Sequence, residues 1–159
     1  MVLKTTRFGD IEIDPESIIT FTQPIIGFLE YRRFILLPGP PDSKLTWLQS
    51  AEAPELAFLL MDPRQVVPDY TVKLTQHDLT ELAATDVADL EIGTLVVVPA
   101  DRSKVRTNLK APILINIKRR LAKQMVLDGN DYPIQFFLAQ ADRGGQKAQK
   151  EVTHARSDA

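Results

Sequence analysis

Asp10-Ile11-Glu12-Ile13-Asp14 alternates strictly between acidic and apolar residues. Neighbouring residues of a β-strand point to opposite faces, so this pattern predicts a strand whose Ile11 and Ile13 face a core while the acids face water. Gly9-Asp10 separates this run from residues 2–8 and indicates a hairpin turn. The N-terminus therefore predicts a β-hairpin, and the rest of the chain repeats the pattern of short strands.

Further apolar or alternating segments, each bounded by turn residues, form a run of about ten expected strands. The valine-rich end of the segment 91–98, which stops at Pro99, is typical of a strand buried on both faces. Tyr70, Val72 and Leu74 fall on one face of another segment. The expected strands after the hairpin are residues 18–21, 34–37, 45–50, 57–61, 70–74, 91–98, 105–109, 112–117, 124–127 and 133–139.

One helix stands out among these strands. Thr75 can cap the backbone N–H of Asp78, and Leu79 and Leu82 form a short apolar stripe after it. Residues 85–90 are expected to continue as a turn or a second short helical piece. Because many short strands accompany one or two short helices, we expect a mostly β fold, a small antiparallel β-barrel or sandwich. Eleven prolines fit strand starts, edges and turns.

Length and composition predict one globular domain with a polar tail. The chain has 159 residues and ordinary hydrophobic content, which is enough for one hydrophobic core. We expect residues 1–141 to form the domain and residues 142–159, rich in Gly, Gln, Lys, Ala and Ser, to be a flexible tail. The sequence has no cysteine, no signal-peptide pattern and no apolar run of membrane-spanning length, so we expect a cytoplasmic protein that does not enter a membrane.

The charge of the chain is unevenly distributed. Residues 1–101 carry a net charge of −9, whereas residues 102–159 carry +7. An acidic first part favours a basic protein partner and repels nucleic acid. The alternative is that these charges only solvate strand faces and loops.

The sequence shows no catalytic, cofactor or metal motif. His77 and Glu81 are four residues apart on the expected helix and could share a face, but no second cluster of ligands supports a metal site. Closely spaced glycines before a helix are absent, as is a serine in a nucleophile elbow. We therefore expect no enzyme activity; a hydrolase or ligand-binding barrel remains an alternative and requires a polar cavity inside the sheet.

One basic cluster, Lys118-Arg119-Arg120-Leu121-Ala122-Lys123, allows a different function. Such a cluster can contact RNA, particularly when exposed aromatic side chains lie nearby for stacking. Tyr132, Phe136 and Phe137 are the nearest aromatics, and the last two are expected in the core. The alternative function is thus an RNA-binding β module. The competing interpretation is that the cluster is a turn between strands whose charges are solvated.

Four stretches of the sequence form one ordered pattern. They are Ile19-Thr20-Phe21-Thr22-Gln23-Pro24-Ile25-Ile26-Gly27-Phe28, Leu48-Gln49-Ser50-Ala51-Glu52-Ala53-Pro54-Glu55-Leu56-Ala57-Phe58, Thr107-Asn108-Leu109-Lys110-Ala111-Pro112-Ile113-Leu114-Ile115-Asn116 and Ala122-Lys123-Gln124-Met125-Val126-Leu127, the last with Tyr132 shortly after it. In this order they resemble the FliW family of bacterial flagellar assembly factors. Together with the strands between them they cover roughly residues 2–138, and the pattern departs from the family at Gln23 and Leu29, where a glycine and an acid are usual.

The resemblance implies a monomeric, non-enzymatic protein with two protein partners. FliW proteins bind the translational regulator CsrA away from its RNA surface and so relieve repression of flagellin messenger RNA. They also bind flagellin, which captures FliW and leaves CsrA free to repress. No cofactor and no direct contact with nucleic acid are implied.

Several residues of the resembling stretches are candidates for partner contact. Apolar side chains in a turn can anchor a partner, and surrounding acids can select its basic residues. Gly27 is expected to adopt a backbone angle that turns Phe28 back onto the core, and Asn108 and Asn116 are expected to satisfy backbone groups at the ends of an apolar strand. The candidates are Ile26, Phe28, Gln49, Glu52, Glu55, Asn108 and Gln124.

Overall fold

The computed structural model describes residues 1–139 and confirms a mostly β fold. The described part contains the α-helix α1 (Gln76–Glu81) and 3₁₀ turns at Pro15–Ser17, Pro63–Gln65, Val87–Asp89 and Arg102–Lys104. Its strands are β1 (Val2–Thr5), β2 (Gly9–Glu12), β3 (Ile19–Gln23), β4 (Arg33–Pro38), β5 (Thr46–Ser50), β6 (Ala57–Met61), β7 (Glu91–Val97), β8 (Arg106–Thr107), β9 (Ile113–Asn116), β10 (Leu121–Gln124) and β11 (Phe136–Phe137). The tail expected at residues 142–159 lies outside the described residues.

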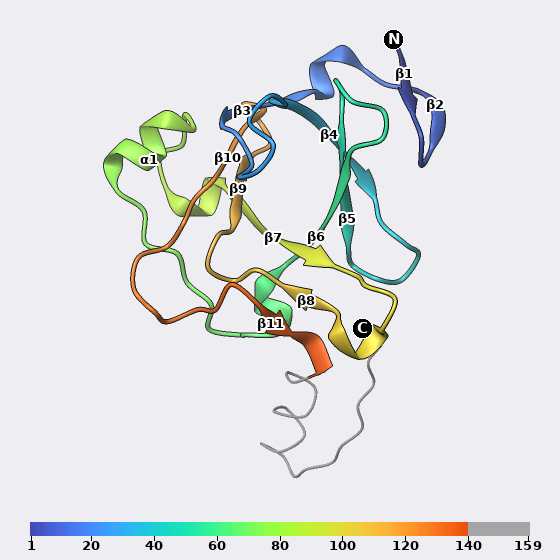
Figure 1. Cartoon of the computed structure of the whole chain (residues 1–159). Helices are drawn as coiled ribbons and strands as arrows, with labels where there is room; N and C mark the ends of the chain where they lie inside the picture. The colour runs from blue at the N-terminus through green and yellow to red at the C-terminus, as the bar shows by residue number, and fades with distance from the viewer. Residues whose placement is uncertain (140–159) are drawn as a thin grey trace.

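Seven of the strands close into a barrel (Figure 1). Hydrogen-bonded neighbours follow the order β7-β6-β5-β4-β3-β10-β9, and β9 pairs again with β7 through Glu91↔Ile115 and Gly93↔Ile113. Strands β8 and β11 extend the sheet from the far end of β7. The structure is therefore a barrel and not a sandwich.

The barrel is antiparallel except at one pair of strands. β10 runs parallel to β3, with Leu121 opposite Thr20 and Ala122 opposite Phe21. The reason is the short turn after β9, which reverses the chain, so that β10 is antiparallel to β9. β10 then lies between β9 and β3 and runs in the same direction as β3. The expectation of a wholly antiparallel sheet is wrong at this pair.

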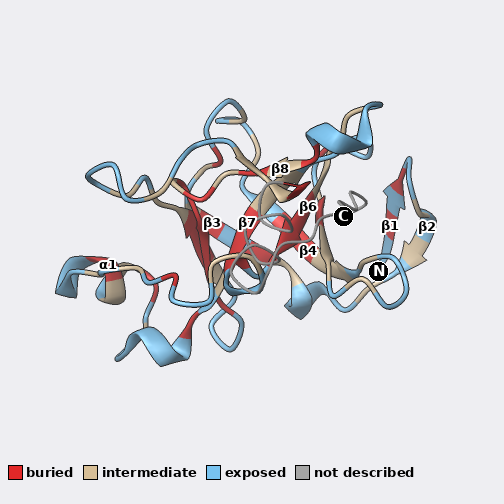
Figure 2. Cartoon of the chain, turned by 90° about the horizontal axis from the view of Figure 1, so that it is seen from below, coloured by how far each residue is buried: buried red, intermediate tan, exposed pale blue. Residues whose placement is uncertain are grey.

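Apolar side chains fill the interior of the barrel. Because side chains alternate across each strand, every barrel strand except β7 contributes at least one buried residue to this core. From β7, Leu95 packs against the core and is partly buried. The buried core residues are Ile19, Phe21, Ile25, Phe34, Leu48, Leu60, Ile113, Ile115 and Ala122. Figure 2 shows these buried residues gathered on the central strands, with exposed residues in the surrounding loops. This packing removes the polar interior that the hydrolase or ligand-binding alternative requires.

The two ends of the barrel differ. At one end, where β3, β5 and β10 finish and β4, β6 and β9 begin, the chain after β3 folds back so that Ile25, Phe28 and Tyr31 pack against the core. We call this the closed end. At the opposite end, where β4, β6 and β9 finish, the described residues supply no such covering loop, and we call it the open end.

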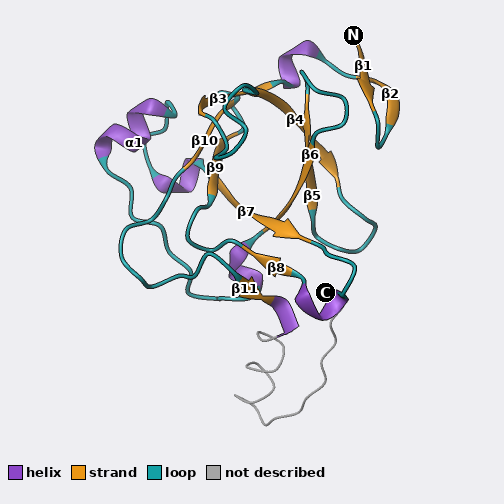
Figure 3. Ribbon diagram, in the orientation of Figure 1, coloured by secondary structure: helices purple, strands orange, loops and turns teal. Residues whose placement is uncertain are grey.

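Two smaller units lie on opposite sides of the barrel (Figures 1 and 3). The hairpin β1–β2 joins the sheet through Thr6 N–H, which donates to Pro54 O at 2.9 Å, and Phe8 meets Trp47 edge-on at 5.8 Å. On the other side, α1 and the segment after it cover a second apolar cluster built around Leu82, Leu90 and Leu114. The expected N-terminal hairpin is confirmed, although its turn is residues 6–8 and Gly9, with φ of +71°, pairs with Thr5.

The helix begins where the sequence predicted. Thr75 Oγ1 accepts from the Asp78 N–H at 3.1 Å, and the Asp78 carboxylate accepts from the Thr75 N–H at 2.8 Å, which closes a capping box. Leu79 and Leu82 point into the second apolar cluster, as their spacing indicated. The expected second helical piece is only the 3₁₀ turn Val87–Asp89.

Two strand predictions are wrong, and each for a physical reason. Residues 70–74 form no strand because no neighbouring strand bonds to them, yet Tyr70 is buried and Val72 and Leu74 pack against the second cluster, so the predicted face is right. Val97 and Val98 are 46% and 48% exposed and not buried on both faces, because the end of β7 passes beyond the barrel and pairs there only with β8.

The other corrections concern the hairpin and β10. Ile11 and Ile13 are only half-buried, because the hairpin covers the outside of the barrel and not its core. β10 covers Leu121–Gln124, so it starts inside the basic cluster and ends where the sequence predicted a strand to begin.

Candidate functional site

The barrel brings all seven candidate residues to its closed end. They come from four segments: the loop after β3, the end of β5 with the turn that follows it, the turn before β9, and the end of β10. Direct hydrogen bonds link the first segment to two of the others, through Glu52 and through Gln124. The resembling stretches, far apart in the sequence, therefore meet at one surface.

The loop after β3 turns two apolar side chains outward. Gly27 has a φ of +93°, a left-handed conformation that favours glycine, and it lets Phe28 fold inward against Phe58 at a ring distance of 5.0 Å. Ile26 on one side of this turn is 61% exposed and Leu29 on the other is 69% exposed. Phe28 is thus a half-buried part of the core and not an exposed anchor, whereas Ile26 is available.

Leu29 was missed by the sequence analysis as a candidate. It stands at one of the two positions where the sequence departs from the FliW pattern, and an exposed leucine in place of an acid was the signal that could have indicated it. The other departure, Gln23, also has a contact of its own: its Nε2 donates to Glu81 Oε2 at 3.0 Å and ties the end of β3 to α1.

Gln124 holds the loop after β3 in place. Its Oε1 accepts from the Ile26 N–H at 2.8 Å, and its Nε2 donates to Ala111 O at 3.1 Å. One half-buried amide therefore connects the loop to the turn before β9. Gln124 positions the exposed Ile26, and one acceptor site and one donor of its amide are used for this.

Asn108 has a similar structural role. Its Oδ1 accepts from the Lys110 and Ala111 N–H groups at 3.0 and 3.1 Å and shapes the turn that leads into β9. At the other end of this strand, Asn116 Nδ2 donates to Leu82 O at 2.8 Å. Both asparagines satisfy backbone groups at the ends of the apolar strand, as the sequence predicted.

The structure corrects the prediction that Gln49 contacts a partner, because its side chain does not reach the surface. Its side chain is fully buried, and its Nε2 lies 3.1–3.2 Å from the carbonyl oxygens of Ser50, Pro54 and Leu56. β5 points this side chain to the outside of the barrel, where the turn between β5 and β6 folds over it. Gln49 therefore shapes that turn and cannot contact a partner in this structure.

Glu52 joins the turn between β5 and β6 to the start of β4. Its Oε1 accepts from the Arg32 and Arg33 N–H groups at 2.8 and 3.2 Å, and its Oε2 lies 3.6 Å from Arg33 Nε. Burial raises the pKa of this carboxyl, but the two backbone N–H groups and the Arg33 guanidinium outweigh burial and hold the pKa below its ordinary value. Glu52 stays ionised, and its carboxylate oxygens are largely occupied by groups of its own chain.

Glu55 is the freer acid of the pair. It is exposed in the same turn, and among the described residues its carboxylate has no ion pair. With Ile26, Leu29 and the partly exposed Glu52 it forms what we call the closed-end surface. This surface offers two exposed apolar side chains on a loop held by Gln124 and Glu52, and one uncommitted negative charge.

The basic cluster divides into two parts. Lys118, Arg119 and Arg120 are exposed in the turn between β9 and β10, whereas Lys123 points to the outside of the barrel and is buried. Lys123 Nζ lies 2.8 Å from Asp78 Oδ1 and 2.8 Å from Glu81 Oε1. Its charge is neutralised by the chain itself, so the RNA-binding alternative loses this residue.

Aromatic residues near the cluster are also committed. Tyr132 stacks on Tyr70 at a ring distance of 4.4 Å, and its hydroxyl accepts from the Thr71 N–H at 3.1 Å. Phe136 and Phe137 are half-buried in β11. These rings give the exposed cations no free stacking platform of the kind that RNA-binding sheets use.

The His77–Glu81 pair lies on one face of α1. His77 Nε2 is 4.0 Å from Glu81 Oε1, and the same carboxylate binds Lys123 and Gln23. Across residues 1–139, the side chains of His, Asp and Glu nowhere form a group of three with metal-binding geometry. Within that range there is also no helix of the length and apolar character needed to cross a membrane.

Comparison with known proteins identifies relatives along nearly the whole chain. The FliW protein family model matches residues 2–138. The flagellar assembly factor FliW of Geobacter sulfurreducens is 39% identical over 98% of this chain and 100% of its own length. The protein of the same description from Bdellovibrio bacteriovorus is 38% identical over 85% of this chain and 77% of its own length.

A solved structure supports the same relationship. A crystal structure of the flagellar assembly factor FliW superposes on this fold with a TM-score of 0.79 and 34% sequence identity, covering 87% of this chain and 96% of the other. Sequence and fold agree over the barrel and the elements that surround it. The chain therefore belongs to the FliW family of flagellar assembly factors.

Proposed function

We propose that this protein is a non-enzymatic, cytoplasmic regulator of flagellar assembly that works by binding two proteins. It binds the RNA-binding regulator CsrA and antagonises it allosterically, and it is itself sequestered by flagellin. In this way it couples flagellin synthesis to flagellar assembly. Membership of the FliW family supports a role in flagellar assembly, and the two partners follow from the resemblance of the sequence to that family.

The observation that carries the proposal is the closed-end surface. Four segments that are distant in the sequence meet there, and one of them, the loop after β3, presents Ile26 and Leu29 as exposed apolar side chains. Exposed apolar groups fixed by hydrogen bonds lose little conformational entropy when a partner covers them. A rigid apolar contact of this kind is typical of a protein-binding site.

Charge supports a basic partner surface. Glu55 is exposed in the turn between β5 and β6, at the same end of the barrel as the loop after β3, and the first 101 residues of the chain carry a net charge of −9. A positively charged partner would be attracted to this region, which raises the rate of association more than the affinity. Glu52 contributes to this field through its depressed pKa, although its oxygens are occupied by Arg32 and Arg33.

Isothermal titration of the purified protein with CsrA and, separately, with flagellin from the same organism tests the proposal. We expect submicromolar binding to both proteins. The variant Leu29→Ser/Glu55→Lys removes an exposed leucine and reverses a free acid without touching the Glu52 or Gln124 contacts. It should weaken binding of at least one partner by about tenfold or more.

A matched control separates this surface from a general effect of charge and polarity. Val87→Ser/Glu16→Lys makes the same two kinds of change at exposed positions that precede β7 and β3, away from the closed end, and it should bind as the wild type does. If the folded wild type binds neither protein, the proposed function is wrong. If both double variants bind normally, the closed-end surface is not the contact.

A further inference from the structure

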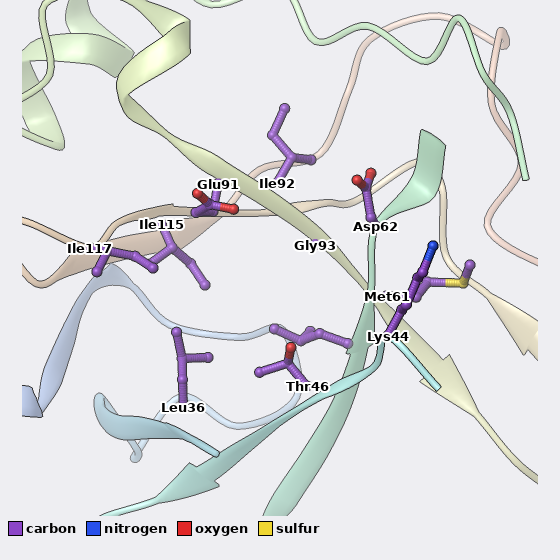
Figure 4. Close-up of a pocket in the computed structure, with 11 residues that line it drawn as sticks. Leu36, Lys44, Thr46, Met61, Asp62, Glu91, Ile92, Gly93, Ile115 and Ile117 are labelled. Carbon is purple, nitrogen blue, oxygen red and sulfur yellow. The ribbon is translucent and has the colours of Figure 1, made fainter. Parts of the chain in front are cut away.

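The open end of the barrel contains a hollow of about 190 Å³ (Figure 4). Its wall is apolar where Leu36, Leu60, Ile115 and Ile117 line it, and Thr46 lies beside Leu36. Figure 4 shows Leu36 and Ile115 pointing toward this common space, whereas Ile92 points away from it. The interior of the barrel, filled elsewhere by its own side chains, is left unfilled here.

Gly93 creates the space. Alternation along β7 places Glu91, Gly93 and Leu95 toward the interior, and Leu95 packs on the barrel core. A Cβ atom added at Gly93 would lie 3.4 Å from Leu60, which is ordinary van der Waals contact. The backbone here is not left-handed, so glycine is not required by the conformation. What the missing side chain provides is room at the mouth of the barrel.

Charged side chains stand at the rim of the hollow. Lys44, Asp62 and Glu91 line it and are exposed, and among the described residues none of the three forms an ion pair. Asp62 uses one carboxylate oxygen to accept from the Arg64 N–H at 2.9 Å, and its other oxygen is free. The rim therefore carries a net negative charge outside an apolar interior.

We propose that this open-end hollow receives one bulky apolar side chain of a protein partner, on a segment that carries an arginine or lysine next to it. The inference rests on the proposed function, since it supplies a second contact for a protein-binding chain. An apolar protein cavity of about 150 Å³ holds a benzene molecule, so a hollow of this size accommodates a phenylalanine or leucine side chain. The neighbouring basic group would meet Asp62 and Glu91.

The distribution of polar groups favours a peptide over a free small molecule. Pockets for small molecules place a few polar groups inside, where they fix the orientation of the ligand. Here the charged groups Lys44, Asp62 and Glu91 lie at the rim, while most of the wall inside is aliphatic. A partner segment brings its own backbone outside the barrel and needs only to insert one side chain, which matches this arrangement.

A titration of the full chain with acetyl-Phe-Arg-amide, followed by amide chemical shifts in NMR, tests the inference directly. We expect saturable shifts at Glu91, Gly93 and Ile115, and about tenfold weaker binding of acetyl-Phe-Glu-amide, whose acid would face the acidic rim. Shifts elsewhere only, or none at millimolar peptide, would overturn the inference.

Two substitutions at one position provide a matched pair. Gly93→Leu fills the hollow and should abolish these shifts, whereas Gly93→Ala adds one methyl group and should preserve them within a few-fold. Ile117→Asp, at an exposed lining residue, gives a second test that does not depend on tolerance at position 93, and it should also abolish binding of the phenylalanine peptide. Normal binding by folded Gly93→Leu or Ile117→Asp would refute the inference.

Titration of the same variants with CsrA and flagellin separates this inference from the proposed function. Weaker binding of one partner by Gly93→Leu, with the Gly93→Ala variant unaffected, supports insertion into the hollow. Equal binding by wild type and Gly93→Leu overturns the inference and leaves the proposed function standing. If the wild type binds neither protein, the proposed function fails and the peptide titration alone decides the inference.

Discussion

The ammonium group of Lys123 lies 2.8 Å from the carboxylate of Asp78, the residue that also closes the capping box of α1. The second carboxylate of the group, Glu81, lies equally close at 2.8 Å and accepts from Gln23 as well. Lys123 is only 6% exposed and Asp78 only 8%. One buried cation therefore fixes both ends of the helix to the barrel wall.

Replacing Lys123 with methionine should destabilise the protein by roughly 3–5 kcal/mol, because two carboxylates would be left close together without their cation. Urea unfolding measures this change in the free energy of unfolding. Lys118→Met is the control, since Lys118 is exposed in the adjacent turn and its loss should change stability by less than about 0.5 kcal/mol. Equal stability of the two variants would show that the ion group contributes nothing.

The same group predicts a pH dependence of stability. Burial raises the pKa of Asp78 and of Glu81, but Lys123 and the hydrogen bonds around them outweigh burial and hold both pKa values below the ordinary 3.8 and 4.5. Burial lowers the pKa of Lys123, and its two carboxylates outweigh this and raise the pKa above 10.5. The stability from the acids is therefore present above their unfolded pKa values and lost as pH falls through the folded ones.

Urea unfolding of wild type and Lys123→Met from about pH 7 to about pH 3 measures this effect. The difference in stability should shrink over the acid range, because the unpaired carboxylates of the variant become neutral while the wild type loses its ion pairs. On the alkaline side, the Lys123 contribution is complete below pH 10.5 and disappears only as pH rises through its raised pKa. A difference that stays constant down to pH 3 would contradict this account.

Replacing Gln124 with leucine should release the loop after β3 without unfolding the barrel. The variant loses the bonds to the Ile26 N–H and to Ala111 O, and each net hydrogen bond is worth about 1 kcal/mol. Hydrogen exchange at the Ile26 amide should accelerate several-fold, while the Leu48 and Ile115 amides remain protected. Unchanged exchange at Ile26 would mean that the loop is held by the packing of Ile25 and Phe28 alone.

Replacing Tyr70 with phenylalanine should cost about 1–3 kcal/mol, because the Leu109 carbonyl would lose a buried donor. The Tyr70 hydroxyl donates to Leu109 O at 2.6 Å, and burial raises the pKa of this phenol well above its ordinary value. Thermal unfolding detects the loss. Tyr31→Phe is the comparison, since Tyr31 has no hydroxyl hydrogen bond among the described residues and its variant should melt close to wild type.

Much of the fold could be predicted from the sequence because local patterns decide it. Alternation placed the strands, the Thr75–Asp78 pair placed the start of the helix, and Gly27 marked the left-handed turn. What local patterns could not give is which strands become neighbours. The parallel pairing of β10 with β3 depends on contacts about 100 residues apart in the chain, and the barrel closes only when β9 also pairs with β7.

The candidate site was predicted less well, for a related reason. Gln49, Asn108 and Gln124 belong to the resembling stretches, but the structure shows their amides bonded to backbone groups of their own chain. A sequence shows that a polar residue is present and not whether its hydrogen bonds are already made. Exposure is the missing quantity, and it moves the interest from Phe28 and Gln49 to Ile26 and Leu29.

The position of the last barrel strands also has a consequence for synthesis of the protein. β3 appears early in the chain, but the strand that pairs with its free side, β10, ends only at Gln124. A nascent chain on the ribosome therefore carries six barrel-forming segments in an unclosed sheet until residues 121–124 emerge, and such edges invite pairing with other chains. Each molecule can therefore become a closed barrel only after residue 124 has been translated.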